Sequence, residues 1–153
     1  MKKIKVLFLC VHNSARSQIA EAFLIKFAGD RFEAMSAGIE PGELNHKVVE
    51  VMKEAGIDIS GNKTKSAFDL FRKNLFFSYV VTVCDKSAAE KCPLFPGVTS
   101  RLHWPFKDPS KFTGNSDEIL EQTRNVRDQI EKKVKDFIYR IDQALPFEKE
   151  DQF

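Results

Sequence analysis

The sequence predicts a single α/β domain, built on a parallel β-sheet that helices cover on both faces. A chain of 153 residues has the size of one ordinary domain, and short apolar segments alternate along it with segments of helical periodicity. The first apolar segment becomes continuous, as in strands buried on both faces. A hydrophobic content of 42%, with 14 Phe, excludes a disordered chain.

The first half of the chain contains two predicted strands and two predicted helices. Residues 3–9 begin with alternating polar and apolar residues and end wholly apolar, which predicts a central strand. Apolar residues recur at helical spacing over 17–28 and again over 45–55, and a glycine after each segment provides a stop. Residues 31–36 form a plausible short strand between the two helices.

The second half continues the alternation. Residues 66–72 predict a short helix, and residues 78–83 and 99–104 predict the third and fourth strands. A long amphipathic helix is expected over 115–145. Its start is indicated by an asparagine at 115 with a glutamate three positions on, as in a capping box. We assign the domain to residues 1–145 and expect residues 146–153 to be a frayed tail.

Charge and composition exclude several classes of partner. Lys and Arg number 24 against 22 Asp and Glu, a net charge of +2, which lacks the basic stripe of nucleic-acid-binding proteins. No apolar run approaches the ~18 residues of a membrane span. Lys5 interrupts the apolar N-terminal stretch, which argues against export. An odd count of three cysteines suits a reducing compartment, so we expect a soluble, cytoplasmic protein.

The junction between the first strand and the following helix, Cys-Val-His-Asn-Ser-Ala-Arg-Ser over 10–17, has the properties of an anion cradle. Backbone N–H groups ahead of a helix N-terminus bind a tetrahedral oxyanion, and Arg16 can hold two of its oxygens. The same donors would stabilise the thiolate of Cys10, which makes it the candidate nucleophile. The alternative is that Cys10 is a small core residue at a strand end. The predicted oxyanion-binding residues are Val11, His12, Asn13, Ser14, Ala15, Arg16 and Ser17.

The other two cysteines are Cys84, at the end of the third strand, and Cys92. Their spacing is too long for a Cys-x2-Cys zinc site and no His cluster accompanies them, so we predict no metal. A helix over 85–91 would hold the sulfurs ~12 Å apart, and a disulfide between them would require that segment to unwind. Alternatively, both are unremarkable thiols.

A further candidate is Asp108, which Pro109 restrains to an extended conformation. We expect the aromatic residues Trp104 and Phe106 to raise its pKa, so that it acts as an acid. A turn-forming Asp-Pro is the alternative. The isolated histidines His12, His46 and His103 are expected to be solvated or packed rather than catalytic.

Residues 6–18, 81–84, 92–93 and 104–109 together resemble the thioredoxin-coupled arsenate reductases, which share the low-molecular-weight tyrosine phosphatase fold. The resemblance implies a four-stranded parallel sheet flanked by helices and no bound cofactor. It implies that Cys10 attacks arsenate, that Arg16 stabilises the oxyanion and that Asp108 protonates the leaving oxygen.

The same resemblance implies a relay of thiols. Cys84 attacks the Cys10–arsenic adduct and releases arsenite, and Cys92 then attacks Cys84. Thioredoxin, or glutaredoxin as another donor, reduces the Cys84–Cys92 disulfide. Phosphate or sulfate should mimic arsenate in the cradle, and we expect a monomer.

Some members of that family bind potassium through residues resembling Asn13, Glu21 and Ser36. The fourth, acidic position falls here among Thr64, Lys65 and Ser66, none of which is acidic.

Two other functions fit parts of the pattern. Cys10, Arg16 and Asp108 suffice for a tyrosine phosphatase, although Ser110 and Lys111 stand where such phosphatases usually carry aromatic residues. A protein that captures arsenite or a soft metal with three sulfurs is the non-enzymatic alternative.

Overall fold

A four-stranded, all-parallel β-sheet forms the centre of the computed structural model, which describes residues 2–153. The strand order is β2-β1-β3-β4, so β1 lies inside the sheet, as predicted. Each strand falls within about two residues of its predicted segment. The strands are β1 (Ile4–Cys10), β2 (Phe32–Gly38), β3 (Tyr79–Thr82) and β4 (Ser100–His103).

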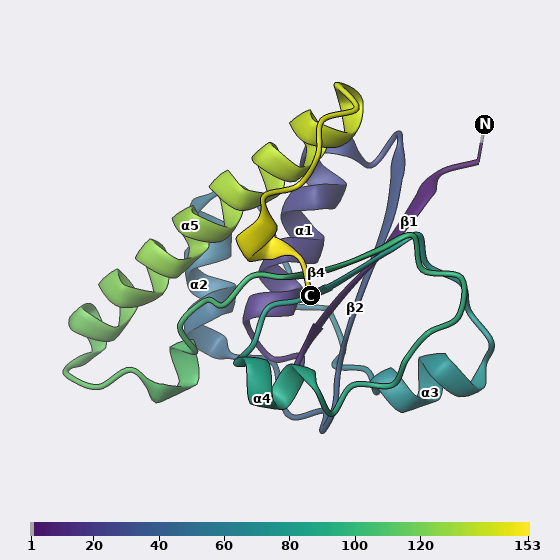
Figure 1. The fold of residues 1–153 in the computed structure, drawn as a ribbon. Helices are drawn as coiled ribbons and strands as arrows, with labels where there is room; N and C mark the ends of the chain where they lie inside the picture. The colour runs from purple at the N-terminus through teal and green to yellow at the C-terminus, as the bar shows by residue number, and fades with distance from the viewer. Residues whose placement is uncertain (1) are drawn as a thin grey trace.

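Helices and loops cover both faces of the sheet, which confirms the predicted three-layer α/β architecture (Figure 1). Side chains alternate along β1, so that Phe8 and Cys10 enter the larger core with α1 and α5, whereas Leu9 enters a smaller core with α3. The helices are α1 (Arg16–Ala28), α2 (His46–Glu54), α3 (Ala67–Arg72), α4 (Lys86–Ala89) and α5 (Ser116–Asp142). Two short 3₁₀ turns, η1 (Pro109–Lys111) and η2 (Lys149–Asp151), complete the fold.

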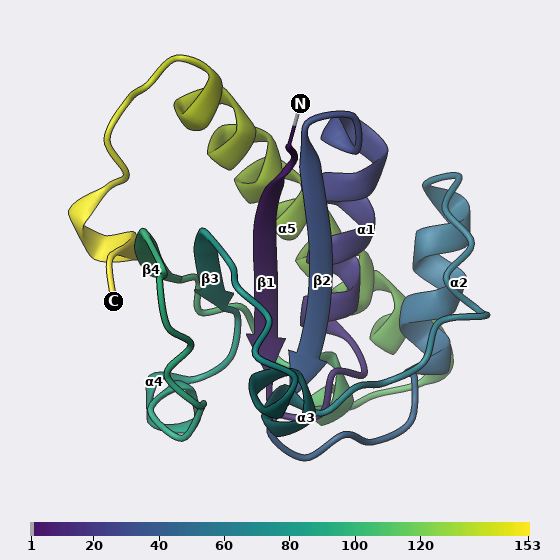
Figure 2. The same ribbon diagram turned by 90° about the vertical axis from the view of Figure 1, so that its right-hand side faces the viewer.

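The carboxyl ends of the strands meet at one edge of the sheet. Figure 2 shows the arrowheads of β1 and β2 pointing toward α3 and α4. In a parallel sheet this edge collects the loops that carry functional residues. The loop after β1 and the Cys84 that follows β3 therefore lie at the same edge.

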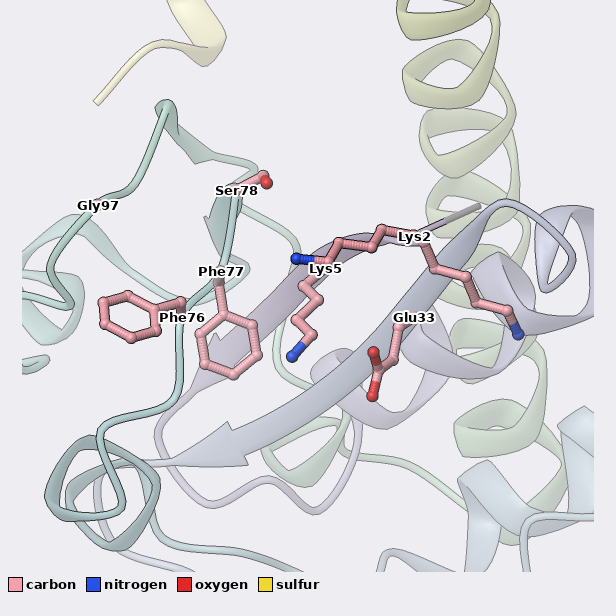
Figure 3. A pocket seen from close by; sticks show the side chains of 8 residues that line it. Lys2, Lys5, Glu33, Phe76, Phe77, Ser78 and Gly97 are labelled. Carbon is pink, nitrogen blue, oxygen red and sulfur yellow. The ribbon is translucent and has the colours of Figure 1, made fainter.

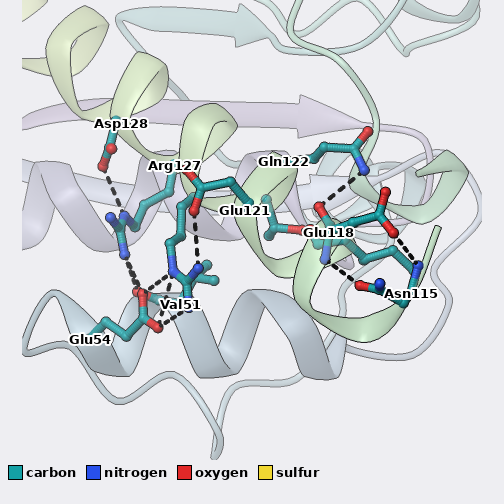
Figure 4. Close-up of polar contacts among 11 residues, drawn as sticks. Val51, Glu54, Asn115, Glu118, Glu121, Gln122, Arg127 and Asp128 are labelled. Carbon is teal, nitrogen blue, oxygen red and sulfur yellow. Dashed lines mark hydrogen bonds and ion pairs between the residues drawn. The ribbon is translucent and has the colours of Figure 1, made fainter. Parts of the chain in front are cut away.

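Helix α5 is anchored at its start by local and long-range contacts (Figure 4). The predicted capping box is present, with Asn115 and Glu118 each accepting a hydrogen bond from the other's backbone N–H. Further along, Arg124 and Arg127 both pair with Glu54 of α2. These contacts fix α5 against α2 on the face that carries the larger core.

The end of α5 differs from the prediction. The helix stops at Asp142 rather than at residue 145, because Ala144 adopts a left-handed conformation with φ of 54°. The Leu145 N–H then donates to the Arg140 carbonyl at 2.8 Å and the Ala144 N–H to the Ile141 carbonyl at 3.2 Å, the pattern of a Schellman motif. Glycine usually occupies that position, and an alanine there is not a recognisable stop signal.

The predicted fraying of residues 146–153 is wrong for this structure. The Phe147 ring lies 5.8 Å from the rings of both Tyr79 and Phe137, and Asp151 pairs with Lys133 at 2.5 Å. Gln152 forms an antiparallel bridge with Leu102. The segment therefore returns to β4, at the edge of the sheet, where it covers backbone groups that would otherwise face solvent.

We expect Phe147→Ala to lower the free energy of unfolding by about 1–3 kcal/mol, because it removes two aromatic contacts from a half-buried position. Urea unfolding measures the change. Leu145→Ala, at a position that is 44% exposed, is the matched control and should change stability little. Equal stabilities for wild type and Phe147→Ala would show that the tail is frayed in solution.

Candidate active site

The loop between β1 and α1 turns sharply around the sulfur of Cys10. Asn13, at its centre, has a φ of 54°, a left-handed conformation that asparagine tolerates better than most residues. The Asn13 N–H consequently points back at Cys10 Sγ, at 3.1 Å.

Two donors converge on the sulfur of Cys10, a residue that is only 2% exposed. Besides the Asn13 N–H, Ser17 Oγ lies 2.8 Å from Cys10 Sγ. Ser17 Oγ already accepts a hydrogen bond from Asn13 Nδ2 at 2.8 Å, so its own hydrogen is available for the sulfur. These two contacts fix the position of the sulfur inside the loop.

The carbonyl groups of the loop are held on its outer side by residues 39–45. The N–H groups of Glu40, Gly42 and Asn45 donate to the carbonyls of Val11, His12 and Ser14, at 2.8, 3.0 and 2.9 Å. The His12 ring adds a hydrogen bond to the Glu40 carbonyl. The amides of His12, Ser14 and Ala15 donate to no residue between 2 and 153. An anion in the cradle would meet these donors.

Gln18 is a positioning residue that the sequence analysis missed. It is fully buried, and its Nε2 donates to the Asn13 carbonyl at 3.1 Å, to Asn13 Oδ1 at 3.2 Å and to the Lys63 carbonyl at 3.2 Å. Asn62 Nδ2 donates to Gln18 Oε1, and the Lys65 N–H donates to Asn13 Oδ1. This network fixes the strained Asn13 from behind.

Gly38, at the end of β2, lies directly against the loop. A Cβ atom added there would come within 2.7 Å of the Asn13 nitrogen and the Val11 oxygen. Both are backbone atoms and cannot move without distorting the cradle. The position therefore requires glycine for this close approach.

Arg16, the first residue of α1, extends from the cradle toward the loop after β4. It is 5% exposed, its Nη1 donates to the Phe106 carbonyl at 3.1 Å, and its Nη2 lies 3.5 Å from Asp108 Oδ2. The structure thus brings Arg16, which lies in the same loop region as Cys10, together with Asp108 from the distant loop after β4.

The expected rise in the pKa of Asp108 is wrong for this structure. Although burial raises it, hydrogen bonds from Ser110 and the charges of Arg16 and Lys111 together hold the pKa of Asp108 below its usual value. Trp104 is instead a buried core residue whose ring contacts Phe8 and Phe137. The carboxyl group is therefore ionised while it faces Arg16.

Cys84 and Cys92 are free thiols near the same edge of the sheet. Burial raises the pKa of Cys84 to about 11. The positive charge of Arg16 opposes this rise, and Cys10 adds to it. Burial also raises the pKa of Cys92 to about 12, and Cys84 and Cys10 add to this effect. Cys84 belongs to the larger core and Cys92 contacts the smaller one, with only the short α4 between them.

Glu21, Ser36 and Lys65 form a separate cluster behind the cradle. Ser36 Oγ donates to Glu21 Oε2 at 2.7 Å. Burial raises the pKa of Glu21, and the Ser36 hydrogen bond and the positive charge of Lys65 oppose that rise. Of the residues that resemble a potassium site, Asn13 is engaged with Gln18, Ser17 and Lys65, and the lysine contributes its own positive charge near Glu21.

A hollow lies at the opposite, amino-terminal end of the sheet (Figure 3). It is open to solvent and contains none of the predicted site residues. Its lining comprises Lys2, Lys3, Lys5, Glu33, Phe76, Phe77, Ser78 and Gly97.

Among residues 2–153, no helix has the length and apolar character that a membrane span requires.

Known proteins share both the sequence and the fold. Residues 5–147 match the family described as low molecular weight phosphotyrosine protein phosphatase. An arsenate reductase of Halalkalibacterium halodurans is 43% identical over 139 residues, covering 90% of this chain and 96% of that relative. A solved structure described as an arsenate reductase in the phosphate binding state superposes with a TM-score of 0.72 and 28% identity, covering 90% of this chain and 98% of that one. A thioredoxin-dependent arsenate reductase from Corynebacterium glutamicum gives a TM-score of 0.68 and 28% identity, covering 93% of this chain and 63% of that one.

We expect Gly38→Ala to weaken the binding of inorganic phosphate by at least about tenfold, because the added methyl group displaces the backbone of residues 11–13. Isothermal titration calorimetry measures the affinity, and thermal unfolding checks that the variant folds. Gly61→Ala is the control, since nothing lies within 4 Å of a Cβ added at that position. Equal phosphate affinities for wild type and folded Gly38→Ala would contradict the assigned cradle.

Proposed function

The chain belongs to the arsenate reductases of the low molecular weight phosphotyrosine protein phosphatase family, and we propose that Cys10, Cys84 and Cys92 carry out the reduction in turn. The observation that carries the proposal is the position of Cys84. Its buried thiol belongs to the same core cluster as Cys10, and it follows β3, the strand that pairs with β1. A phosphatase acting through Cys10 alone has no use for a second thiol there.

In the first step, the Cys10 thiolate attacks arsenic. A sulfur–arsenic bond forms and one arsenic–oxygen bond breaks, and the oxygen leaves as water when it gains a proton. The loop amides and the Arg16 guanidinium bind the remaining oxygens and stabilise the charge that develops on them. In this proposal, Asp108 delivers the proton once it has acquired one, since its resting form is a carboxylate.

In the second step, the Cys84 thiolate attacks Cys10 Sγ. The sulfur–sulfur bond forms as the sulfur–arsenic bond breaks, and its electron pair stays on arsenic. Arsenic(V) becomes arsenic(III) and leaves as arsenite, while the two thiols become a Cys10–Cys84 disulfide. The nearby charge of Arg16 supports this step, because it opposes the effect of burial on Cys84.

In the third step, the Cys92 thiolate attacks Cys84 Sγ and releases Cys10 as a thiolate. The segment between them contains only the four-residue α4, with Lys86 and Ser87 exposed, so little structure is lost when it unwinds. The Cys84–Cys92 disulfide is then reduced by a dithiol donor. We propose thioredoxin as this donor, supported by the similarity to a thioredoxin-dependent enzyme.

A second candidate activity is hydrolysis of phosphate monoesters. The grouping of Cys10, Arg16 and Asp108 favours it, since these residues supply a nucleophile, an oxyanion clamp and a proton carrier. We propose it as a side activity, with arsenate as the substrate that uses all three cysteines.

We expect Cys92→Ser to release a single equivalent of arsenite per protein and then stop, with Cys10 and Cys84 joined by a disulfide. Mass spectrometry of peptides after alkylation identifies the bond. Cys10→Ser should release none, because it lacks the nucleophile. Repeated turnover by Cys92→Ser with thioredoxin and its reductase as the electron source would rule out the relay.

We also expect the rate of that single turnover to rise roughly fivefold to tenfold per pH unit between about pH 7 and 9. The reason is that burial raises the pKa of Cys84 to about 11, so its thiolate is scarce at pH 7 and increases with pH. Rapid-quench measurement of arsenite release from Cys92→Ser at saturating arsenate tests this. A rate independent of pH would show that deprotonation of Cys84 does not limit the step.

A further inference from the structure

Residues 148–153 lie along β4, the outermost strand of the sheet, and we call them the strap. Gln152 forms an antiparallel bridge with Leu102, and the Phe153 N–H donates to the Arg101 carbonyl at 3.1 Å. Figure 1 shows the strap in yellow, where the chain returns from α5 to β4. The strand β4 therefore has β3 on one side and the strap on the other.

The strap is also anchored to α5. Asp151, which is only 9% exposed, pairs with Lys133 at 2.5 Å. Breaking an ion pair that is mostly buried leaves an unpaired charge, so this contact fixes the strap against the helix. The strap lies beyond residues 5–147, the part of the chain that matches the family. Neither the oxyanion cradle nor the three thiols include it.

The strand β4 holds both ends of the segment 84–92, which begins and ends with the second and third thiols. His103 Nδ1 and Thr82 Oγ1 are hydrogen-bonded at 2.7 Å, two residues before the segment. Arg101 Nη2 donates to the Phe95 carbonyl at 2.8 Å, three residues after the segment. Both anchors therefore depend on the position of one strand.

The strap contacts the two residues of β4 that form these anchors. The Phe153 ring lies 5.8 Å from the His103 ring, and the Arg101 carbonyl accepts the Phe153 N–H. A hollow of about 240 Å³ separates the strap from α4. Its lining comprises Lys86, Glu90, His103, Glu150, Gln152 and Phe153. The strap, β4 and α4 thus enclose one space beside the segment that carries the thiols.

The second and third thiols are held apart while α4 is folded. Both are free, and Cys84 packs in the larger core whereas Cys92 packs against the smaller one. A disulfide between them requires the segment 84–92 to leave this arrangement. Any contact that is made only in the arrangement with α4 folded therefore opposes the disulfide, by as much free energy as the contact loses.

We propose that the strap is a positioning element of the relay, which acts through β4 to hold the segment 84–92 in its folded arrangement and so disfavours the Cys84–Cys92 disulfide. The inference rests on the proposed function, because it gives the strap a part in the third step. An early bond to Cys92 would consume the thiol that has to attack Cys10. The strap therefore keeps Cys84 available for the second step.

The test measures the equilibrium of the two thiols with dithiothreitol in a Cys10→Ser background, in which Cys84 and Cys92 are the remaining cysteines. Oxidised dithiothreitol accepts two electrons and two protons from the two thiols, so its disulfide opens as theirs forms. Mixtures of known ratio are brought to equilibrium, quenched with acid and alkylated. Mass spectrometry of the peptides then gives the fraction of protein that carries the Cys84–Cys92 disulfide.

Deletion of residues 148–153 should raise the equilibrium constant for disulfide formation by about threefold to tenfold, because it removes the contacts that support β4. Asp151→Ala keeps the whole chain but releases the strap from α5, and should raise the constant by about twofold or more.

The matched control is Glu54→Ala. It breaks the ion pairs of Glu54 with Arg124 and Arg127, between α2 and α5, and Figure 2 shows α2 on the opposite side of the molecule from β4. This variant should be less stable than its Cys10→Ser parent in thermal unfolding, yet form the disulfide with the same equilibrium constant.

An unchanged or smaller constant in the folded deletion variant would overturn the role of the strap, and Asp151→Ala decides if the deletion variant does not fold. An equal rise in Glu54→Ala would also overturn it, because the effect would then follow from overall stability. Arsenate does not enter this experiment. Failure of the wild type to reduce arsenate would therefore refute the proposed function, while the dithiothreitol equilibrium would still decide whether the strap opposes the disulfide.

Discussion

The hydrogen bonds that converge on the sulfur of Cys10 are the constraint on which the rest of the site depends. A buried polar sulfur needs donors in place of the water it has lost, and here the Asn13 N–H and the Ser17 hydroxyl take that role. The Asn13 N–H points at the sulfur because Asn13 is left-handed. The Ser17 hydroxyl points there because its oxygen already accepts a hydrogen bond from Asn13 Nδ2. The local strain at one residue therefore fixes both contacts of the sulfur that we propose as the nucleophile.

Distant parts of the fold maintain that strained loop. Gln18 and residues 62–65 hold Asn13 from behind, Gly38 allows β2 to approach it, and residues 39–45 hold its carbonyls outward. The parallel sheet adds the second and third thiols, because the carboxyl ends of β1 and β3 meet at one edge. In the function that we propose, these cysteines make a scaffold for binding an oxyanion into a redox site.

Much of this arrangement was predictable from sequence because it depends on local pattern. The continuous apolar character of β1, the helical spacing of α1 and α5, and the capping box at Asn115 each act over a few residues. The missed features depend on partners far along the chain. The role of Gln18 depends on Lys63, and the order of the tail depends on contacts of Phe147 with Tyr79. The lowered pKa of Asp108 is a different case, because burial opposes it and hydrogen bonds from the nearby Ser110 contribute more to it than the charge of Arg16. The left-handed Ala144 carries no residue-type signal at all.

The central proposal is that the loop between β1 and α1 makes Cys10 the nucleophile, through the two groups that contact its sulfur. The most direct test is the rate at which iodoacetamide alkylates Cys10 at pH 6, measured by mass spectrometry of the modified peptide and compared with free cysteine. Because the Asn13 N–H and the Ser17 hydroxyl stabilise the reacting sulfur, we expect Cys10 to be alkylated faster than free cysteine, and more slowly when Ser17 is replaced by alanine. Reaction of Cys10 at the rate of free cysteine, in both wild type and Ser17→Ala, would contradict the account.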